Sequence, residues 1–193
     1  MNLVRRLTVV LQITTAFFVL PALVYADSPA PPRDYKKVTE NNEYVFVMLA
    51  PDEGAKHQDS ATRGIYKQSG LYRNDGSTSP LWVVYWYSFE VYPSSDGKHL
   101  VRMGPWASSV EQLALSFHRN GEEIRSYRIR DLVRDETKLS RTVSHFFWRS
   151  ELRYDDKRGL LFLKTRDNQT YWFSVKTGEI EQETKGEQTP AKP

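Results

Sequence analysis

An aromatic run between Leu81 and Tyr92 holds the densest group of residues that could do chemistry. As a β-strand it has two faces, because successive side chains point to opposite sides. One face is nearly unbroken and apolar, and we expect it to face the core: Leu81, Val83, Tyr85, Tyr87, Phe89 and Val91. The other face carries Trp82, Trp86 and Glu90. Two indoles beside a carboxylate suit a stacking platform for a sugar ring or a peptide.

The alternative is that this strand is central and covered on both faces. Trp82 and Trp86 then simply pack against their neighbours. Aromatic side chains dominate cores because of their large apolar area, so packing is their more common role. The two interpretations differ in the exposure of the indoles.

A second candidate is the stretch from Arg102 to Trp106, which contains Gly104-Pro105. This dipeptide is expected to end a strand, so Trp106 enters a loop, where exposed aromatic residues more often bind something. Trp106 could equally fold back as a lid over the sheet. The binding residues predicted from the sequence are Trp82, Trp86, Glu90, Arg102 and Trp106.

Signatures of catalysis and of metal binding are weak. The chain has no cysteine, which excludes thiolate nucleophiles and thiolate metal sites. The four histidines lie far apart rather than at the close spacing of paired metal ligands: His57, His99, His118 and His145. No Gly-x-Ser-x-Gly elbow and no phosphate-cradling glycine loop occurs. We therefore expect no catalytic residue, no metal and no cofactor.

The elements that must position these residues follow a β pattern. Short runs rich in Val, Ile, Tyr, Phe and Trp alternate with turn residues, and helical periodicity is nearly absent. Asp96-Gly97 and Asn120-Gly121 predict hairpins, because Asn or Asp before Gly accommodates the positive φ angles of a tight primed turn. A third hairpin is predicted at Asp167-Asn168. The other predicted elements are strands at 43–49, 64–72 and 81–92, a short helical turn at 129–135, and a core face of Tyr171, Phe173 and Val175.

The stretches 94–101 and 172–179 resemble strands and turns in blades of WD or quinoprotein-type β-propellers. The resemblance covers about half of the mature chain. A closed propeller commonly needs at least about four blades, and a folded region of about 150 residues supplies three or fewer. The predicted fold class is therefore all-β, with antiparallel meander sheets resembling two to three blades in an open sheet or sandwich. The whole chain is also similar to small exported bacterial proteins of unassigned function.

The N-terminus carries the features of an export signal. Arg5 and Arg6 precede an apolar run at 7–24, and the small-residue exit predicts cleavage after Ala26. The expected organisation is a signal peptide at 1–26, an extended leader at 27–35, one β domain at 36–181 and a flexible tail at 182–193. The mature protein is expected to be periplasmic or secreted, without stable membrane insertion.

Cleavage also changes the charge, because it removes two of the 27 basic residues and none of the 24 acidic ones. The formal net charge falls from +3 to +1, which gives no electrostatic reason to expect nucleic acid as a partner.

The leading functional hypothesis is a noncatalytic exported module that binds a partner protein or a glycan through its aromatic residues. One alternative is an extracellular hydrolase with a carboxylate pair such as Glu90 and Asp156. The other is a structural subunit that assembles with its own copies, because blade-like sheets leave edges that invite pairing. The sequence leaves the oligomeric state open.

Overall fold

The computed structural model describes residues 30–51 and 58–184. The predicted export signal, residues 27–29 of the predicted leader, His57 and the end of the tail lie outside the described residues. Within them, no helix has both the length and the apolar character needed to cross a membrane.

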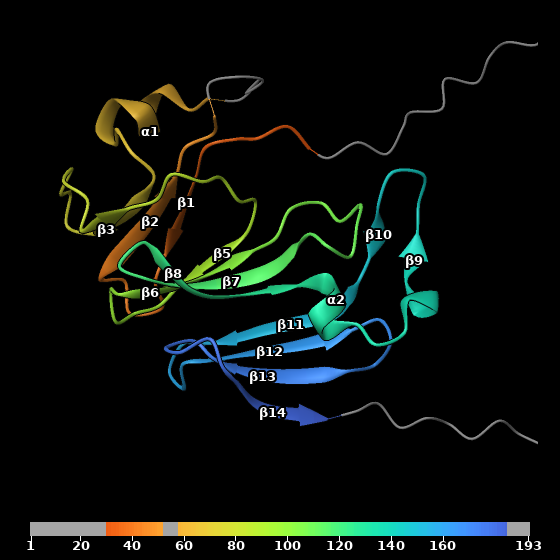
Figure 1. Cartoon of the computed structure of the whole chain (residues 1–193). Coiled ribbons are helices and arrows are strands. Elements are labelled where there is room, and N and C mark those ends of the chain that lie inside the picture. The colour runs from red at the N-terminus through yellow and green to blue at the C-terminus, as the bar shows by residue number, and fades with distance from the viewer. Residues whose placement is uncertain (1–29, 52–57, 185–193) are drawn as a thin grey trace, which may run out of the picture.

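The described residues form three four-stranded antiparallel meanders and one two-stranded hairpin, none of them closed into a barrel or ring (Figure 1). The first sheet contains β1 (Tyr35–Val38), β2 (Tyr44–Met48), β3 (Gly70–Arg73) and β4 (Trp82–Val83). The second contains β5 (Val91–Pro93), β6 (His99–Met103), β7 (Leu113–Arg119) and β8 (Glu122–Arg128). The third contains β11 (Arg149–Asp155), β12 (Leu160–Thr165), β13 (Thr170–Ser174) and β14 (Ile180–Thr184). The predicted all-β class is confirmed.

Few residues are helical. The short elements outside the three sheets are α1 (Ser60–Ile65), α2 (Ile129–Leu132), the 3-10 helix η1 (Glu136–Lys138) and the hairpin strands β9 (Ser140–Arg141) and β10 (Phe146–Phe147). The helical turn predicted at 129–135 is confirmed in its first part by α2, and Val133 is already extended. The β9–β10 hairpin stands at one end of the molecule, beyond the third sheet (Figure 1).

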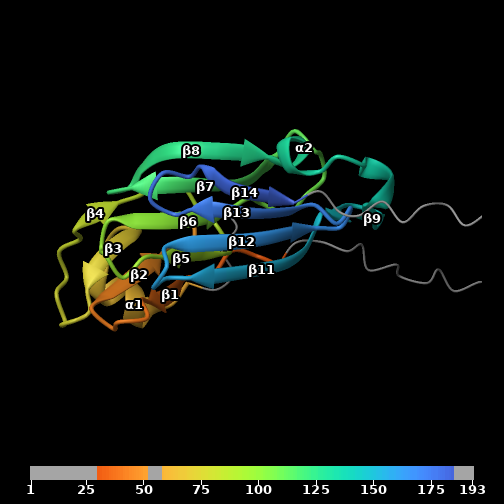
Figure 2. The ribbon, with the colours of Figure 1, turned by 90° about the horizontal axis from the view of Figure 1, so that it is seen from below.

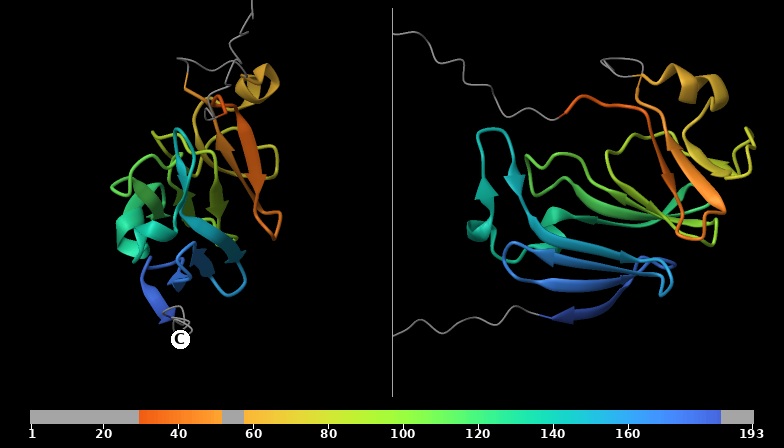
Figure 3. Two further views of the ribbon diagram at one scale, coloured as in Figure 1. Left: turned by 90° about the vertical axis from the view of Figure 1, so that its right-hand side faces the viewer. Right: turned by 180° about the vertical axis from the view of Figure 1, so that it is seen from behind.

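The second sheet lies between the other two, and Figure 2 shows the third sheet covering one of its faces. Alternation along its strands sends Leu115 and Phe117 to a core shared with Phe173 of the third sheet. Leu100 belongs instead to a core shared with Phe46 of the first sheet. The three meanders therefore form three layers, which the view from behind also shows (Figure 3). The predicted core face of β13 is confirmed, because Tyr171, Phe173 and Val175 are all buried.

The three predicted hairpins are confirmed, but of the two predicted primed turns only Asn120-Gly121 has a positive φ at both residues, because Asp96 lies outside that region. Asn120 and Gly121 both have positive φ, 52° and 87°, as a primed turn requires. Gly97 and Asn168 take the same left-handed region in the other two turns. A Cβ at position 121 would lie 2.4 Å from the Val83 carbonyl oxygen. The turn between β7 and β8 therefore rests directly on the first sheet.

The continuous strand predicted at 81–92 is wrong. The chain is extended only at β4 and again at β5, and between them it passes from the first sheet to the second. The Ser88 hydroxyl bonds to the backbone at this bend, with its oxygen 2.9 Å from both the Glu90 and the Met103 carbonyl oxygens. This bend breaks the two-residue period on which the face assignment depends.

The predicted core face of this segment is therefore also wrong. Tyr85 is 91% exposed, and Leu81 and Phe89 are each nearly half exposed. Trp82, Val84 and Ser88, whose side chains would lie on the opposite face of such a strand, are buried instead, although Val91 is buried as predicted.

The strand predicted at 64–72 is wrong in its first part. Gly64 and Ile65 end α1, and β3 begins only at Gly70. The helix begins because the Asp59 side chain accepts a hydrogen bond from the Ala61 backbone N–H at 3.0 Å. A capping carboxylate of this kind satisfies a backbone donor that the first turn leaves without a partner.

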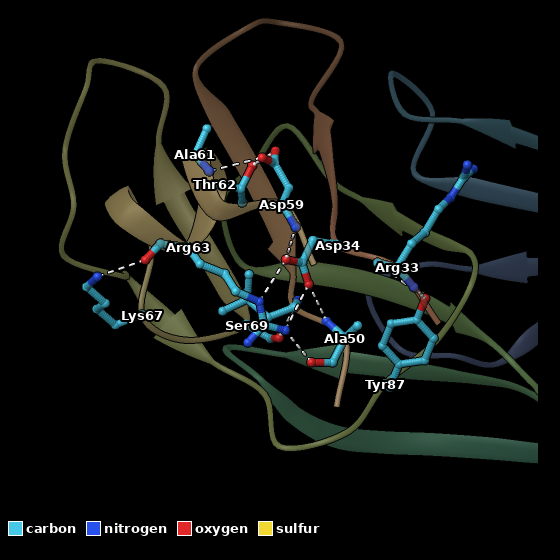
Figure 4. A network of polar contacts seen from close by, with 11 residues as sticks. Arg33, Asp34, Ala50, Asp59, Ala61, Thr62, Arg63, Lys67, Ser69 and Tyr87 are labelled. Carbon is cyan, nitrogen blue, oxygen red and sulfur yellow. Dashed lines mark hydrogen bonds and ion pairs between the residues drawn. The ribbon is translucent and has the colours of Figure 1, made fainter. Parts of the chain in front are cut away.

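Asp34 ties the start of β1 to this helix (Figure 4). Its side chain is 1% exposed and pairs with the Arg63 guanidinium at 2.8 Å. It also accepts the backbone N–H groups of Ala50 at 2.7 Å and Asp59 at 2.9 Å. Burial raises the pKa of Asp34, but the hydrogen bonds from these three partners and the Arg63 charge outweigh it, so the pKa is lowered. The segment before β1 is thus fixed to the fold by a buried carboxylate.

Candidate functional site

The structure divides the five predicted binding residues into two groups. Glu90 and Trp106 line one pocket at the end of the second sheet. The other three lie elsewhere: Trp82, Trp86 and Arg102 belong to the interface between the first and second sheets.

Trp82 has a packing role in this interface. The indole is 9% exposed, and its ring centroid lies 5.8 Å from that of Phe46. Its Nε1–H donates a hydrogen bond to the Gly97 carbonyl oxygen at 2.9 Å. The buried indole therefore has a partner for its only polar group.

Trp86 and Arg102 form a second packed group. The Arg102 guanidinium lies 4.4 Å from the Trp86 ring centroid, in cation–π geometry. His118, which is almost fully buried, has its ring centroid 5.0 Å from that of Trp86. Trp86 is half-buried, so Arg102 and His118 lie against a ring that is only partly open to solvent.

The pocket that holds Glu90 and Trp106 has a volume of about 360 Å³. Three of its lining aromatic residues are partly exposed and form its rim: Phe89 at 46%, Trp106 at 37% and Phe147 at 47%. Its deeper walls include the buried Met103, Phe146 and Trp148. We call this the aromatic pocket.

Two segments from different parts of the chain bring these rings together. At Gly104 the chain passes so close to β7 that a Cβ would lie 1.7 Å from the Leu113 carbonyl oxygen. The Phe146 backbone N–H then donates to the Ala107 carbonyl oxygen at 2.9 Å, which joins the β9–β10 hairpin to the Trp106 loop. The loop that carries Trp106 is therefore held against the hairpin.

His145 packs against two residues of the rim. Its ring centroid lies 4.0 Å from that of Trp106 and 4.8 Å from that of Phe147. Its Nδ1 lies 2.6 Å from the Thr142 hydroxyl oxygen, so the ring has a fixed orientation. One imidazole thus supports two of the three rim residues.

The polar end of the aromatic pocket is an ion pair between two sheets. Arg149 Nη2 lies 2.5 Å from Glu90 Oε2, and the Tyr92 hydroxyl donates to the same carboxylate. Burial raises the pKa of Glu90, but the hydrogen bonds from Arg149 and Tyr92 and the charges of Arg149 and Lys37 outweigh it, so the pKa is lowered. Burial, together with this carboxylate, raises the pKa of Tyr92. Glu90 is thus held as an anion and Tyr92 as a neutral phenol.

A second hollow of about 640 Å³ adjoins the aromatic pocket. The two share the lining residues Ala30, Phe89 and Glu90. Three basic residues of the chain around β1 complete the second hollow: Arg33, Lys36 and Lys37. We call it the basic hollow.

The described lining of the aromatic pocket contains one carboxylate, that of Glu90. Asp156, the partner considered for a hydrolase, binds elsewhere: it accepts hydrogen bonds from Ser94, Ser95 and Tyr154. No group of three or more acidic or histidine side chains that could hold a metal occurs in the part of the chain that the structure describes.

Sequence reasoning missed the residues on the hairpin side of the pocket. They form one continuous run, His145-Phe146-Phe147-Trp148-Arg149, in which a histidine and an arginine flank three aromatic residues. A run this rich in aromatic residues was a usable signal of a binding site. Nothing in the sequence near it, however, indicates that it meets the Gly104-Pro105 loop.

Comparison of the chain with protein-family models and with curated proteins found no match. The aromatic pocket and the basic hollow are therefore the features from which we infer a function.

Proposed function

We propose that the mature chain is an exported, noncatalytic module that binds a partner protein. The aromatic pocket takes an apolar side chain from an exposed segment of that partner. The observation that carries the proposal is the rim of Phe89, Trp106 and Phe147, three partly exposed rings around a hollow of about 360 Å³. This volume lies at the small end of ligand pockets, which suits one side chain or a short segment.

The composition of the pocket supports a protein ligand. Trp and Arg are enriched among the residues that dominate protein interfaces, and the pocket contains Trp106 and Arg149. A sugar platform uses an open aromatic face. Trp106 instead has a ring contact with His145, and the other side chains of the rim are apolar.

The electrostatics of Glu90 support a noncatalytic role. A general acid works best with a pKa near the operating pH. The pKa of Glu90 is lowered, and its oxygens accept hydrogen bonds from Arg149 and Tyr92. The carboxylate therefore suits a fixed charge in a binding surface.

Panning of a random peptide library displayed on phage tests the binding proposal. The parent protein is expected to enrich peptides with an apolar or aromatic residue, and Trp106→Ala and Phe147→Ala to lose them. Tyr85→Ala is the matched control, because that ring is 91% exposed and lies outside the aromatic pocket. Circular dichroism verifies that each variant is folded.

Two results would contradict the proposal. One is enrichment that Trp106→Ala and Phe147→Ala leave unchanged. The other is binding on a glycan array that disappears in Trp106→Ala while no peptide is enriched, which would assign the pocket to a glycan.

The proposed export needs its own test. The full chain with a C-terminal tag is expressed in a bacterium, and the periplasmic and medium fractions are analysed by intact-mass spectrometry. We expect a species that begins after Ala26. An uncleaved chain confined to the cytoplasm or membrane would contradict this part.

A further inference from the structure

The basic hollow is built by a different part of the chain from the aromatic pocket. Arg33 and Lys37 come from the chain around β1, while Phe89 and Glu90 precede β5 and line both hollows. The Arg33 backbone N–H donates to the Tyr87 hydroxyl oxygen at 3.0 Å, and this hydroxyl donates to the Arg33 carbonyl oxygen at 3.1 Å (Figure 4). The backbone of Arg33 is thereby fixed against the segment that leads into the aromatic pocket.

The charge of the basic hollow is positive. Its described lining has three cations and one carboxylate, that of Glu90, which already pairs with Arg149. Lys36 is also attracted to Asp59, so Arg33 and Lys37 carry the excess charge toward the hollow.

Lys37 is the better-placed of these two cations. Its ammonium lies 4.0 Å from the Tyr92 ring centroid, in cation–π geometry. The side chain is half-buried, and this burial lowers the pKa of Lys37, although the charge of Glu90 opposes the shift. A partly desolvated cation gains more from an anionic partner than a cation in bulk water does.

The strand that carries Lys37 also suits an extended chain as the ligand. β1 is the edge of the first sheet, so antiparallel pairing with β2 leaves the backbone groups of alternate residues pointing away from the sheet. A peptide segment beside such an edge has both backbone partners and side-chain sites.

We infer that the basic hollow is an anion subsite, and that the ligand of the aromatic pocket is a peptide in which acidic residues adjoin an apolar one. The apolar side chain enters the aromatic pocket, and the carboxylates of its neighbours lie near Lys37 and Arg33. This inference rests on the proposed function, because it names the chemistry of the protein segment that the module binds.

Three fluorescein-labelled synthetic peptides test the inference by fluorescence anisotropy. Each has a central Trp, flanked in the three peptides by Glu, Gln or Lys. At low salt we expect the Glu peptide to bind about tenfold more tightly than the Gln peptide. This advantage should shrink at about 0.5 M NaCl, where exposed charges are screened over a few ångströms. The Lys peptide should bind most weakly.

Variants of the two cations separate the subsites. Arg33→Gln with Lys37→Gln is expected to reduce the affinity for the Glu peptide to that for the Gln peptide, which should itself be unchanged. Arg33→Gln alone, at an exposed side chain, should give part of this loss and keeps the test valid if the double variant is unstable. Lys157→Gln, at an exposed turn lysine outside both hollows, is the matched control.

Failure of the inference differs from failure of the proposed function. If Trp106→Ala weakens all three peptides but the Glu and Gln peptides bind equally, only the anion subsite is overturned. Tightest binding of the Lys peptide would overturn it as well, because Glu90 would then be the recognising charge. If no peptide binds, or if Trp106→Ala changes nothing, the proposed function fails and the inference fails with it.

Discussion

Arg149 at the start of β11 and Glu90 just before β5 form an ion pair, with Nη2 and Oε2 2.5 Å apart. The pair joins the second and third sheets across 59 residues of sequence. Each of the two side chains is one-third exposed. The pair therefore has a structural effect that can be measured without any ligand.

Glu90→Gln is expected to lower the free energy of unfolding by about 1–3 kcal/mol, because Arg149 loses its charged partner. Urea denaturation measures the loss. The matched control is Glu179→Gln, which removes a carboxylate from an exposed pair with Arg125 at 3.2 Å. Exposed pairs contribute little, so the control should lose under about 0.5 kcal/mol. Equal losses in the two variants would contradict this assignment.

The same pair predicts a dependence on pH. The folded-state pKa of Glu90 is below its ordinary value of 4.5, so its contribution to stability is present above pH 4.5. It is lost as the pH falls through the lower folded value. The difference in unfolding free energy between the parent and Glu90→Gln should therefore shrink on acidification. A difference that stays constant to pH 2 would show that the charge is not responsible.

His118 predicts a second pH effect, with a different window. Burial lowers the pKa of this imidazole, and the charge of Arg102 adds to the effect, while Glu123 and the Gly121 backbone oppose it. The unfolded chain takes up a proton near pH 6.5 and the folded chain only at lower pH, so stability falls as the pH drops below 6.5.

His118→Gln is expected to flatten this dependence. The amide keeps a partner for the Ser116 hydroxyl, which lies 2.9 Å from His118 Nε2, but does not titrate. Urea denaturation from pH 8 to pH 5 should show a slope of up to about 1.4 kcal/mol per pH unit in the parent and a smaller one in the variant. Identical slopes would exclude His118 as their source.

Gly121→Ala tests the contact between the second hairpin and the first sheet. Gly121 has a positive φ, and a Cβ would lie 2.4 Å from the Val83 carbonyl oxygen. Gly76 also has a positive φ, 90°, but a Cβ there meets nothing within 4 Å. Thermal unfolding should show a loss of about 1 kcal/mol for Gly76→Ala and at least twice that for Gly121→Ala. Similar losses would mean that the turn moves freely away from β4.

The sequence predicted the elements whose shape is determined locally. Asn120-Gly121 specifies a primed turn through the φ angles of its own two residues, and the alternation in β13 specifies its buried face. The segment 81–92 failed because its bend is set by a distant partner, the Met103 carbonyl beside the Ser88 hydroxyl. Periodicity carries no information about such a contact.

The candidate site was only partly predictable for the same reason. Trp106 was recognised because Gly104-Pro105 marks a loop in the sequence itself. The hairpin that completes the pocket reaches this loop through the bond between Phe146 and Ala107, which joins segments with no shared pattern. The aromatic composition predicted that the chain has a binding site. Which residues form it depends on tertiary contacts that the sequence pattern does not show.

Asp34→Asn tests whether the Asp34 carboxylate anchors β1. This strand carries Lys37, which lines the basic hollow. The Asp34 carboxylate accepts bonds from Arg63, Ala50 and Asp59, and an amide replaces one acceptor oxygen with a donor. Loss of one partner of a buried pair should cost about 2–4 kcal/mol in urea denaturation. Asp75→Asn, at an exposed turn, should cost clearly less than Asp34→Asn.

The pH dependence identifies the charge of Asp34 as the cause. Its lowered pKa means that the carboxylate contributes stability above its ordinary value of 3.8, and that this contribution is lost as the pH falls through the folded value. The parent and Asp34→Asn should therefore converge in acid. If they instead differ equally at pH 7 and below pH 2, the loss comes from shape rather than charge. In that case β1 would be anchored by the backbone bonds around Asp34, and Lys37 would keep its position without the ion pair.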